Sequence, residues 1–327
     1  MIITCLSAYD EELVRRLAGT DEIEVRIASG SGDRAELTAL VADADIVIAD
    51  AARRYVLDAA AIDAMTRCRF IQQPAVGYDT VDVDRAALRG IPVANTPGYN
   101  ADAVADWVIM AMLVVLRGGV TADTALRERG WAAPPLGDEL GSRTVGLVGM
   151  GAVARAVTAR LRGFGSPVLF TARTPRTVEG ARQVELGELL TGADVVSLHL
   201  PVNDETRGLI GARELAAMRE GAVLVNSARG GLVDHDALAE GLRAGRPAAA
   251  ALDVFEPEPL PADSALRALD NVYLSPHIAA GTWQARGRVR AMVGENLRRV
   301  LGGEPPLHVV NAHDQAVQSS AAAAVQD

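Results

Sequence analysis

The sequence predicts an α/β protein with two doubly wound parallel sheets, and three observations lead to this class. Short aliphatic runs alternate with helical patterns along almost the whole chain. The chain has 327 residues, which is a comfortable length for two domains. Hydrophobic residues make up 49% and aromatic residues only 4% of the chain, as expected where central strands are aliphatic and covered on both faces.

The first hundred residues predict one small sheet. The turn formers Asn95, Thr96, Pro97 and Gly98 indicate where this domain ends. Strands are expected at residues 1–6, 22–28, 46–49 and 70–72. Helices are expected at residues 10–17, 33–41 and 57–65.

Residues 99–283 predict a second sheet. A long apolar helix at 100–117 leads into it, and the segment 130–141, which contains Pro134 and Pro135, is expected to be a linker or arm. Six strands alternating with helices are what a full dinucleotide-binding sheet needs. These strands are expected at residues 144–148, 168–171, 195–198, 223–226, 249–253 and 272–274.

The segment 144–165 contains a G-x-G-x-x-A pattern between a strand and a helix. Gly149 permits a tight turn, Gly151 lets the backbone approach a pyrophosphate, and the small Ala154 lets the helix pack closely on its strand. The start of the helix offers free N–H groups and a partial positive charge to phosphates. Gly149, Gly151, Ala152 and Val153 are therefore predicted cofactor-binding residues.

A final helix is expected at residues 292–301, and we interpret it as returning to the first domain. Residues 1–98 with 284–327 would then form a flavodoxin-like substrate domain, and residues 99–283 a Rossmann domain inserted into it. A small-molecule site is expected in the cleft between two such domains. The low-complexity tail after His308 is expected to be frayed.

The composition and charge of the chain exclude several kinds of partner and indicate where the protein is located. The net charge of −10 argues against a nucleic-acid partner. The sequence has no run of about 18 apolar residues, so no membrane span is predicted. No secretory signal is apparent at the N-terminus. We therefore expect a cytoplasmic protein. Cys5 and Cys68 show no metal-ligand spacing and are interpreted as small core residues, and no metal is expected.

Several further motifs follow one another in a fixed order. They are VGYD (76–79), RGIPVANTP (89–97), LP with NDETRG (200–208), VNSARG (225–230), DVFEPEP (253–259) and SPHI (275–278). In this order the set closely resembles the D-isomer specific 2-hydroxyacid dehydrogenase family, which includes glyoxylate/hydroxypyruvate reductases and phosphoglycerate dehydrogenase. The resemblance covers almost the whole chain.

The resemblance implies an oxidoreductase that interconverts a 2-oxo acid and a D-2-hydroxy acid. Arg229 matches the residue that binds the substrate carboxylate, for which a planar and always charged fork is suited. His277 matches the acid/base residue, and Glu258 matches its carboxylate partner. Glu258 is preferred over Glu256 by the resemblance alone.

Other matches are to binding residues. The backbone N–H groups of Val76 and Gly77 would bind the substrate carboxylate, and Asp253 would hold the nicotinamide carboxamide. His199, His235, His308 and His313 have no comparable context and are interpreted as surface or packing residues. Further cofactor contacts are expected at Leu200, Pro201, Thr206, Ser227 and Ala228.

Two departures from the family pattern concern the cofactor. Ala172 stands where an NAD-preferring site usually has an acid, and Arg173, Thr174 and Arg176 follow it. A hydroxyl and two guanidinium groups would attract a 2′-phosphate, so we predict a preference for NADP, with NAD possible as an alternative. Ala152 stands where the family often has Arg.

Trp131 falls in a segment that forms a dimerisation arm in family members, and we expect a homodimer. Trp131 and Trp283 are candidates for the substrate pocket, with plain packing as the alternative. Two other functions share the scaffold: a dehydrogenase for another reductant, such as phosphite, or for a natural-product intermediate, and a dinucleotide-sensing binding protein.

Overall fold

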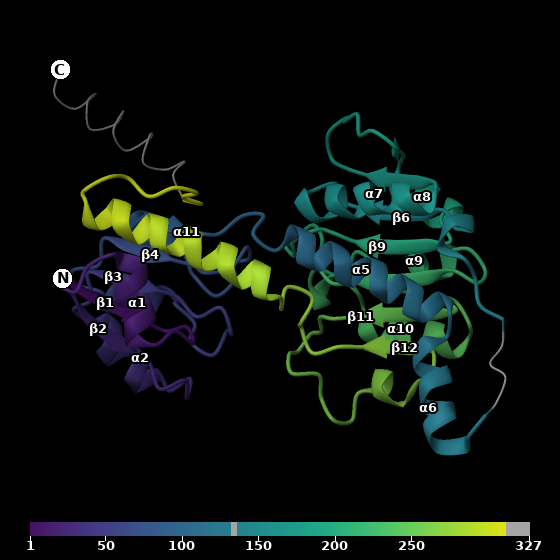
Figure 1. Ribbon diagram of the computed structural model, residues 1–327, viewed down its shortest axis with the longest axis horizontal. Helices are drawn as coiled ribbons and strands as arrows, with labels where there is room; N and C mark the ends of the chain where they lie inside the picture. Colours follow the sequence, from purple (N-terminus) through teal and green to yellow (C-terminus); the bar gives the residue numbers. More distant parts are fainter. Residues whose placement is uncertain (132–135, 312–327) are drawn as a thin grey trace. The chain divides into compact units, whose positions relative to one another are not determined.

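The computed structural model describes residues 1–131 and 136–311, and it confirms the predicted class of two parallel-sheet α/β units (Figure 1). Unit 1 comprises Met1–Tyr99 and the segment that begins at Trp283, and unit 2 comprises Asn100–Thr282. Pro134, Pro135, His313 and the low-complexity tail lie outside the described residues.

Unit 1 holds a five-stranded parallel sheet with the order β2-β1-β3-β4-β5. An aspartate caps each helix that follows a strand: Asp10, Asp33, Asp58 and Asp82 accept from backbone N–H groups of the first turn. The strands are β1 (Ile2–Cys5), β2 (Glu24–Ile27), β3 (Ile46–Ile48), β4 (Phe70–Gln72) and β5 (Val93–Ala94). The helices are α1 (Glu11–Ala18), α2 (Arg34–Val41), α3 (Ala59–Ala64), α4 (Val83–Leu88) and α11 (Trp283–Leu301).

Unit 2 holds a seven-stranded parallel sheet with the order β12-β11-β10-β9-β6-β7-β8. The strands are β6 (Val145–Val148), β7 (Val168–Thr171), β8 (Arg182–Gln183), β9 (Val195–Leu198), β10 (Val223–Asn226), β11 (Ala249–Leu252) and β12 (Val272–Leu274). The α-helices are α5 (Ala101–Leu116), α6 (Gly119–Arg129), α7 (Ala152–Phe164), α8 (Leu186–Gly192), α9 (Ala212–Ala217) and α10 (His235–Arg243). Short 3-10 turns lie at Leu140–Ser142, Gly230–Leu232 and Ala265–Ala268.

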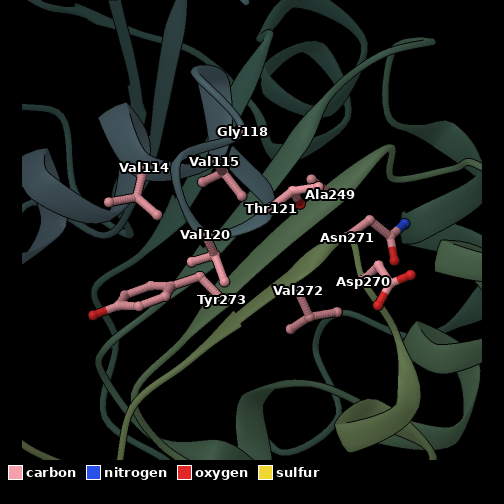
Figure 2. A pocket seen from close by; sticks show the side chains of 10 residues that line it. All are labelled: Val114, Val115, Gly118, Val120, Thr121, Ala249, Asp270, Asn271, Val272 and Tyr273. Atoms are coloured by element: carbon pink, nitrogen blue, oxygen red, sulfur yellow. The ribbon is translucent and has the colours of Figure 1, made fainter. Parts of the chain in front are cut away.

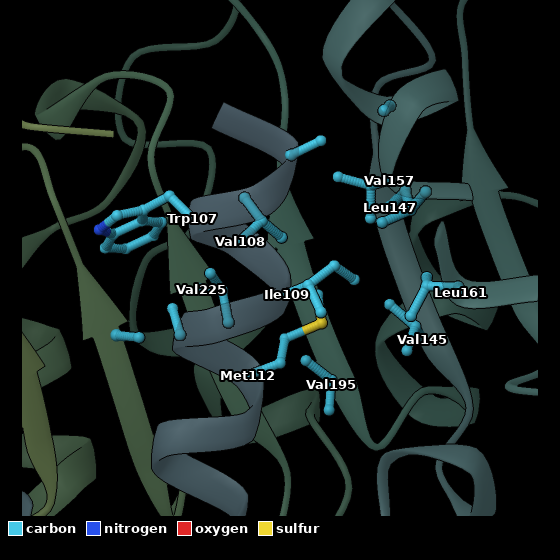
Figure 3. Close-up of a cluster of buried hydrophobic side chains, with 14 of the residues drawn as sticks. Trp107, Val108, Ile109, Met112, Val145, Leu147, Val157, Leu161, Val195 and Val225 are labelled. Carbon is cyan, nitrogen blue, oxygen red and sulfur yellow. The ribbon is translucent and has the colours of Figure 1, made fainter. Parts of the chain in front are cut away.

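Alternate residues of the unit 2 strands point to opposite faces, and each face is covered by helices. On one face Met112 of α5 and Leu161 of α7 pack over Val145 and Leu147 of β6 (Figure 3). On the other face α8, α9 and α10 bury their leucines against β9, β10 and β11. The carboxyl ends of the strands therefore share one open edge, where ligands of this architecture bind.

Four elements were not predicted, and one was predicted too short. β5 and β8 have only two residues each, too few for a periodic signal. The α4 segment is also short. α6 buries none of its residues in the described structure, and its few apolar residues carry no helical period. The expected helix at 292–301 begins nine residues earlier, at Trp283, because Ala285 and Val289 continue its buried face through an arginine-rich stretch.

Both cysteines are free, and burial raises the pKa of each thiol to about 12. Among the described helices, none is by itself long and apolar enough to cross a membrane. Only α5 and α6 taken together, with a 59° bend between them, meet the length and composition criteria.

Candidate active site

The glycine turn after β6 has the geometry that phosphate binding requires. Gly149 has φ +99°, and a Cβ there would lie 2.7 Å from the carbonyl oxygen of His199, so only glycine fits. A Cβ at Gly151 would meet open space. Within the described chain the backbone N–H groups of Ala152 and Val153 have no acceptor. These orphan donors at the start of α7 fit the pyrophosphate of a dinucleotide.

The loop after β7 places the predicted arginines beside this turn. Arg173, Thr174 and Arg176 are exposed. The Arg176 guanidinium Nη1 donates to the carbonyl of Met150, inside the glycine turn, at 3.3 Å. A side chain that the sequence did not single out holds this loop: Gln183 on β8 accepts from the Arg176 N–H at 2.7 Å. Its amide nitrogen donates to the carbonyls of Ala172 and Thr174 at 3.1 and 3.2 Å.

The loop after β9 brings Leu200 and Pro201 to the same edge. A Cβ at Gly149 would lie 2.8 Å from a methyl carbon of Leu200, so this side chain packs on the glycine turn. The Thr206 hydroxyl donates to the Pro201 carbonyl at 2.8 Å and thus holds its own loop. Its role toward a cofactor stays a prediction.

The loop after β10 carries Arg229 and is fixed by Asn226. The Asn226 amide donates to the Arg229 carbonyl at 2.9 Å, and its oxygen accepts from the Ala228 N–H at 3.0 Å. The Arg229 guanidinium donates to the Ala228 carbonyl at 2.7 Å. Ser227 has a buried hydroxyl oxygen that lacks any protein partner in the described structure, as expected of a ligand contact.

Gly230 lets this loop lie directly on the next one. A Cβ at Gly230 would lie 2.0 Å from the carbonyl carbon of Phe255, a distance that no side chain tolerates. The segment that carries Arg229 is therefore packed against the turn that carries Glu258.

Asp253, at the carboxyl end of β11, anchors the loop that carries His277. It is fully buried, and its carboxylate accepts from the Ser275 hydroxyl at 2.5 Å and from the N–H groups of Ile278 and Ala279 at 2.8 Å each. Its carbonyl accepts from the His277 N–H at 2.8 Å. The structure thus assigns Asp253 a positioning task that the sequence did not indicate, and contact with a carboxamide stays a prediction.

His277 and Glu258 form the predicted pair. His277 Nδ1 lies 2.9 Å from Glu258 Oε2, and the other carboxylate oxygen accepts from the Phe255 N–H at 3.0 Å. His277 has φ +54°, an uncommon conformation for a residue other than glycine. Glu256 points elsewhere and binds the Arg207 guanidinium at 2.6 Å. The geometry therefore distinguishes two glutamates that the sequence separated only by resemblance.

Val76 and Gly77 belong to unit 1, in the loop after β4. The Asn95 amide donates to the Val76 carbonyl at 2.8 Å, and the Gln73 amide donates to the Gly77 carbonyl at 3.0 Å. Among the described residues, the N–H groups of Val76 and Gly77 meet no acceptor. The two donors are left available for an anion such as a carboxylate.

The remaining histidines and tryptophans differ in burial. Burial lowers the pKa of His199 to about 4, and desolvation also lowers the pKa of His235, whereas His308 is exposed. Trp131 is 95% exposed and Trp283 is 78% exposed, so plain packing within the described chain does not explain either. The Arg286 guanidinium lies 4.5 Å from the centroid of the Trp283 ring.

Unit 2 also has a largely apolar pocket of about 310 Å³, which includes Val114, Val120 and Tyr273 (Figure 2). Ala249 and Val272 begin β11 and β12, so this pocket lies at the amino ends of the strands, opposite the predicted site residues. The described residues contain no group of three or more His, Cys, Asp or Glu side chains that could hold a metal.

Comparison with known proteins agrees with this geometry. Residues 109–279 match the family model of the D-isomer specific 2-hydroxyacid dehydrogenase NAD-binding domain. A glyoxylate reductase from Korarchaeum cryptofilum is 40% identical over 264 residues, which are 78% of this chain and 80% of the relative. A D-3-phosphoglycerate dehydrogenase from Mycobacterium leprae is 37% identical over 307 residues, 92% of this chain but only 57% of that longer protein.

A solved structure is also similar. It is an NADPH-dependent glyoxylate/hydroxypyruvate reductase from Sinorhizobium meliloti, in complex with NADP and malonate. It has a TM-score of 0.84 and 32% sequence identity, and the match covers 94% of this chain and 96% of that chain.

Proposed function

The chain belongs to the D-isomer specific 2-hydroxyacid dehydrogenase family, and we propose that it reduces glyoxylate or hydroxypyruvate with NADPH as the preferred reductant. It is an NAD(P)-dependent enzyme that interconverts a 2-oxo acid and a 2-hydroxy acid. Relatives named glyoxylate reductase support the choice of a small substrate.

The observation that carries this proposal is the His277–Glu258 pair at 2.9 Å, on a loop that Asp253 fixes by three hydrogen bonds. Glu258 holds Nδ1 of the ring, so Nε2 is left to serve the substrate. The Glu258 carboxylate fixes the orientation of the imidazole, which places the ring to transfer a proton through Nε2.

The chain's own residues account for the rest of the reaction. When bound, the reduced nicotinamide supplies a hydride to C2 of the substrate. Arg229 binds the substrate carboxylate through its planar guanidinium and stabilises the charge that develops on the C2 oxygen. His277 donates its Nε2 proton to that oxygen, so the product carries one added hydride and one added proton, and the ring returns to its neutral form. In unit 1, the backbone N–H groups of Val76 and Gly77 are donors of the kind that binds a carboxylate.

The preference for NADPH rests on the loop after β7. Ala172 offers no carboxylate to the ribose hydroxyls, and Arg173 and Arg176 are exposed beside the glycine turn. An acid at this position would repel a 2′-phosphate, whereas guanidinium groups attract it.

We also propose a homodimer. α6 buries none of its residues, and Val120 and Leu126 on it are 45% and 53% exposed. Trp131 follows at 95% exposure, and the apolar pocket of Figure 2 adjoins the same helix. Exposed apolar area of this kind is typical of a surface that a second copy covers.

Light scattering on the wild type and on a Leu126→Glu, Trp131→Ala variant tests the homodimer. We expect the wild type to be a dimer and the variant to be a monomer. A monomeric wild type would refute the proposal.

The enzymatic proposal is tested by oxidation of NADPH and NADH with glyoxylate, hydroxypyruvate, pyruvate and phenylpyruvate. Turnover with glyoxylate or hydroxypyruvate, faster with NADPH than with NADH, is expected. Cofactor binding without turnover of any of the four acids would contradict the proposal and favour a specialised substrate, another reductant or a dinucleotide sensor.

A further inference from the structure

Two arginines from different elements meet at one backbone carbonyl of the glycine turn. The carbonyl oxygen of Met150 accepts from Nη1 of Arg155 at 3.1 Å and from Nη1 of Arg176 at 3.3 Å. Arg155 lies on α7, and Arg176 lies in the loop after β7. The sequence analysis identified Arg176 but not Arg155.

The helix geometry explains how Arg155 reaches the turn. Arg155 follows Ala152 by three residues, so both lie on the same face of α7. Side chains of a helix lean toward its N-terminus, and Arg155 accordingly bonds a carbonyl five residues before it. A guanidinium from the second turn of α7 therefore lies at the glycine turn.

The charge of this pair is not neutralised by the protein. In the described part of the chain, neither Arg155 nor Arg176 lies in an ion pair. Two other arginines of α7 behave differently: Arg160 pairs with acidic residues of α5, and Arg162 pairs with Glu179. Two guanidinium groups that share one carbonyl repel each other, and this arrangement is stabilised when an anion lies between them.

We propose that Arg155 and Arg176 together bind the 2′-phosphate of NADPH, and that Arg155 is a cofactor-specificity residue of this enzyme. A 2′-phosphate is a monoester with nearly two negative charges and three acceptor oxygens near neutral pH, so it can satisfy two guanidinium groups at once. The pyrophosphate has separate donors in the free N–H groups of Ala152 and Val153. This inference rests on the proposed preference for NADPH.

The experiment measures the Kd of NADPH and of NADH by nucleotide fluorescence, without substrate. The variants are Arg155→Gln and, as a matched control on the same helix, Arg160→Gln, which removes the same charge from a side chain that pairs with α5 and not with the loop after β7. Loss of one charge-assisted contact is expected to raise the Kd of NADPH about tenfold in Arg155→Gln. The Kd of NADH should change by less than about twofold, and Arg160→Gln should leave both values unchanged.

Equal weakening of NADPH and NADH in Arg155→Gln would assign the residue to the pyrophosphate and overturn the proposal. Unchanged binding of both would overturn it as well. Failure of the proposed function has a different signature, because the wild type would then lack turnover of 2-oxo acids while Arg155→Gln still lost affinity for NADPH selectively.

Discussion

Two regions at the carboxyl edge of the unit 2 sheet differ in whether their charged side chains have partners within the protein. At the carboxyl ends of β11 and β12, Asp253 is enclosed by three donors and Glu258 is bonded to His277. At the carboxyl ends of β6 and β7, by contrast, the described structure provides no acidic partner for Arg155 or Arg176. Proton transfer needs a geometry that exists before the substrate arrives, whereas a phosphate site can be completed by the charge of its ligand.

Among the residues that support His277, the largest effect is expected at Glu258. Glu258→Gln removes the charge beside His277 Nδ1 and should lower kcat by about 10²-fold to 10³-fold, in the range of general acid catalysis. Glu256→Gln is the matched control, because Glu256 binds Arg207 instead, and its kcat should stay within about threefold of the wild type. Steady-state kinetics measure both. Similar losses in the two variants would contradict the distinct role of Glu258.

His199 lies between the two regions, at the end of β9, and its protonation is expected to affect stability. Burial lowers the pKa of His199 from 6.5 to about 4, so between these values the unfolded chain takes up a proton that the folded chain does not. The free energy of unfolding therefore decreases as the pH falls from 6.5 to 4, by up to about 3 kcal/mol.

His199→Gln should remove this part of the pH dependence. Urea unfolding at pH 7 and pH 4.5 gives the free energy of unfolding of the variant and of the wild type, and the difference between the two proteins is compared at the two pH values. An identical pH dependence in both proteins would contradict a half-buried histidine that stays neutral in the folded protein.

The anchoring role of Asp253 predicts a combined loss of stability and activity. In Asp253→Asn one carboxylate oxygen is replaced by an amide N–H donor that faces another donor. The buried group is then left without a hydrogen bond, which should lower the free energy of unfolding by about 1–3 kcal/mol. The loop of His277 should loosen, so kcat should fall with the unfolding free energy. Asp263→Asn, in an exposed loop of the same unit, is the control and should change neither. A stable variant that loses only cofactor affinity would instead indicate direct contact with the nicotinamide.

The smallest effect is expected at Gln183, which holds the arginine loop on the phosphate side. Gln183→Ala removes three hydrogen bonds to that loop and should raise the Kd of NADPH about fivefold, equivalent to about 1 kcal/mol. NADH should bind as before. Weaker binding of both nucleotides would show that the loop supports the whole cofactor site.

The sequence predicted the longer strands because their aliphatic runs end at turn formers, and the site motifs lie at those ends. It failed for β5 and β8, whose two residues carry no period, and for α6, which buries nothing. The same limit applies to the site. Gln183 lies on the two-residue strand β8, and Arg155 looks like a solvated helix residue until Met150 is placed beside it.

The central claim is that His277, oriented by Glu258, donates the proton during reduction. Stopped-flow measurement of NADPH oxidation in a single turnover tests it in His277→Gln, with the Kd of NADPH as the control for folding and binding. We expect the rate to fall by about 10²-fold to 10⁴-fold while the Kd stays within about twofold of the wild type. A near wild-type rate with intact binding would contradict the assignment and place the proton donor elsewhere.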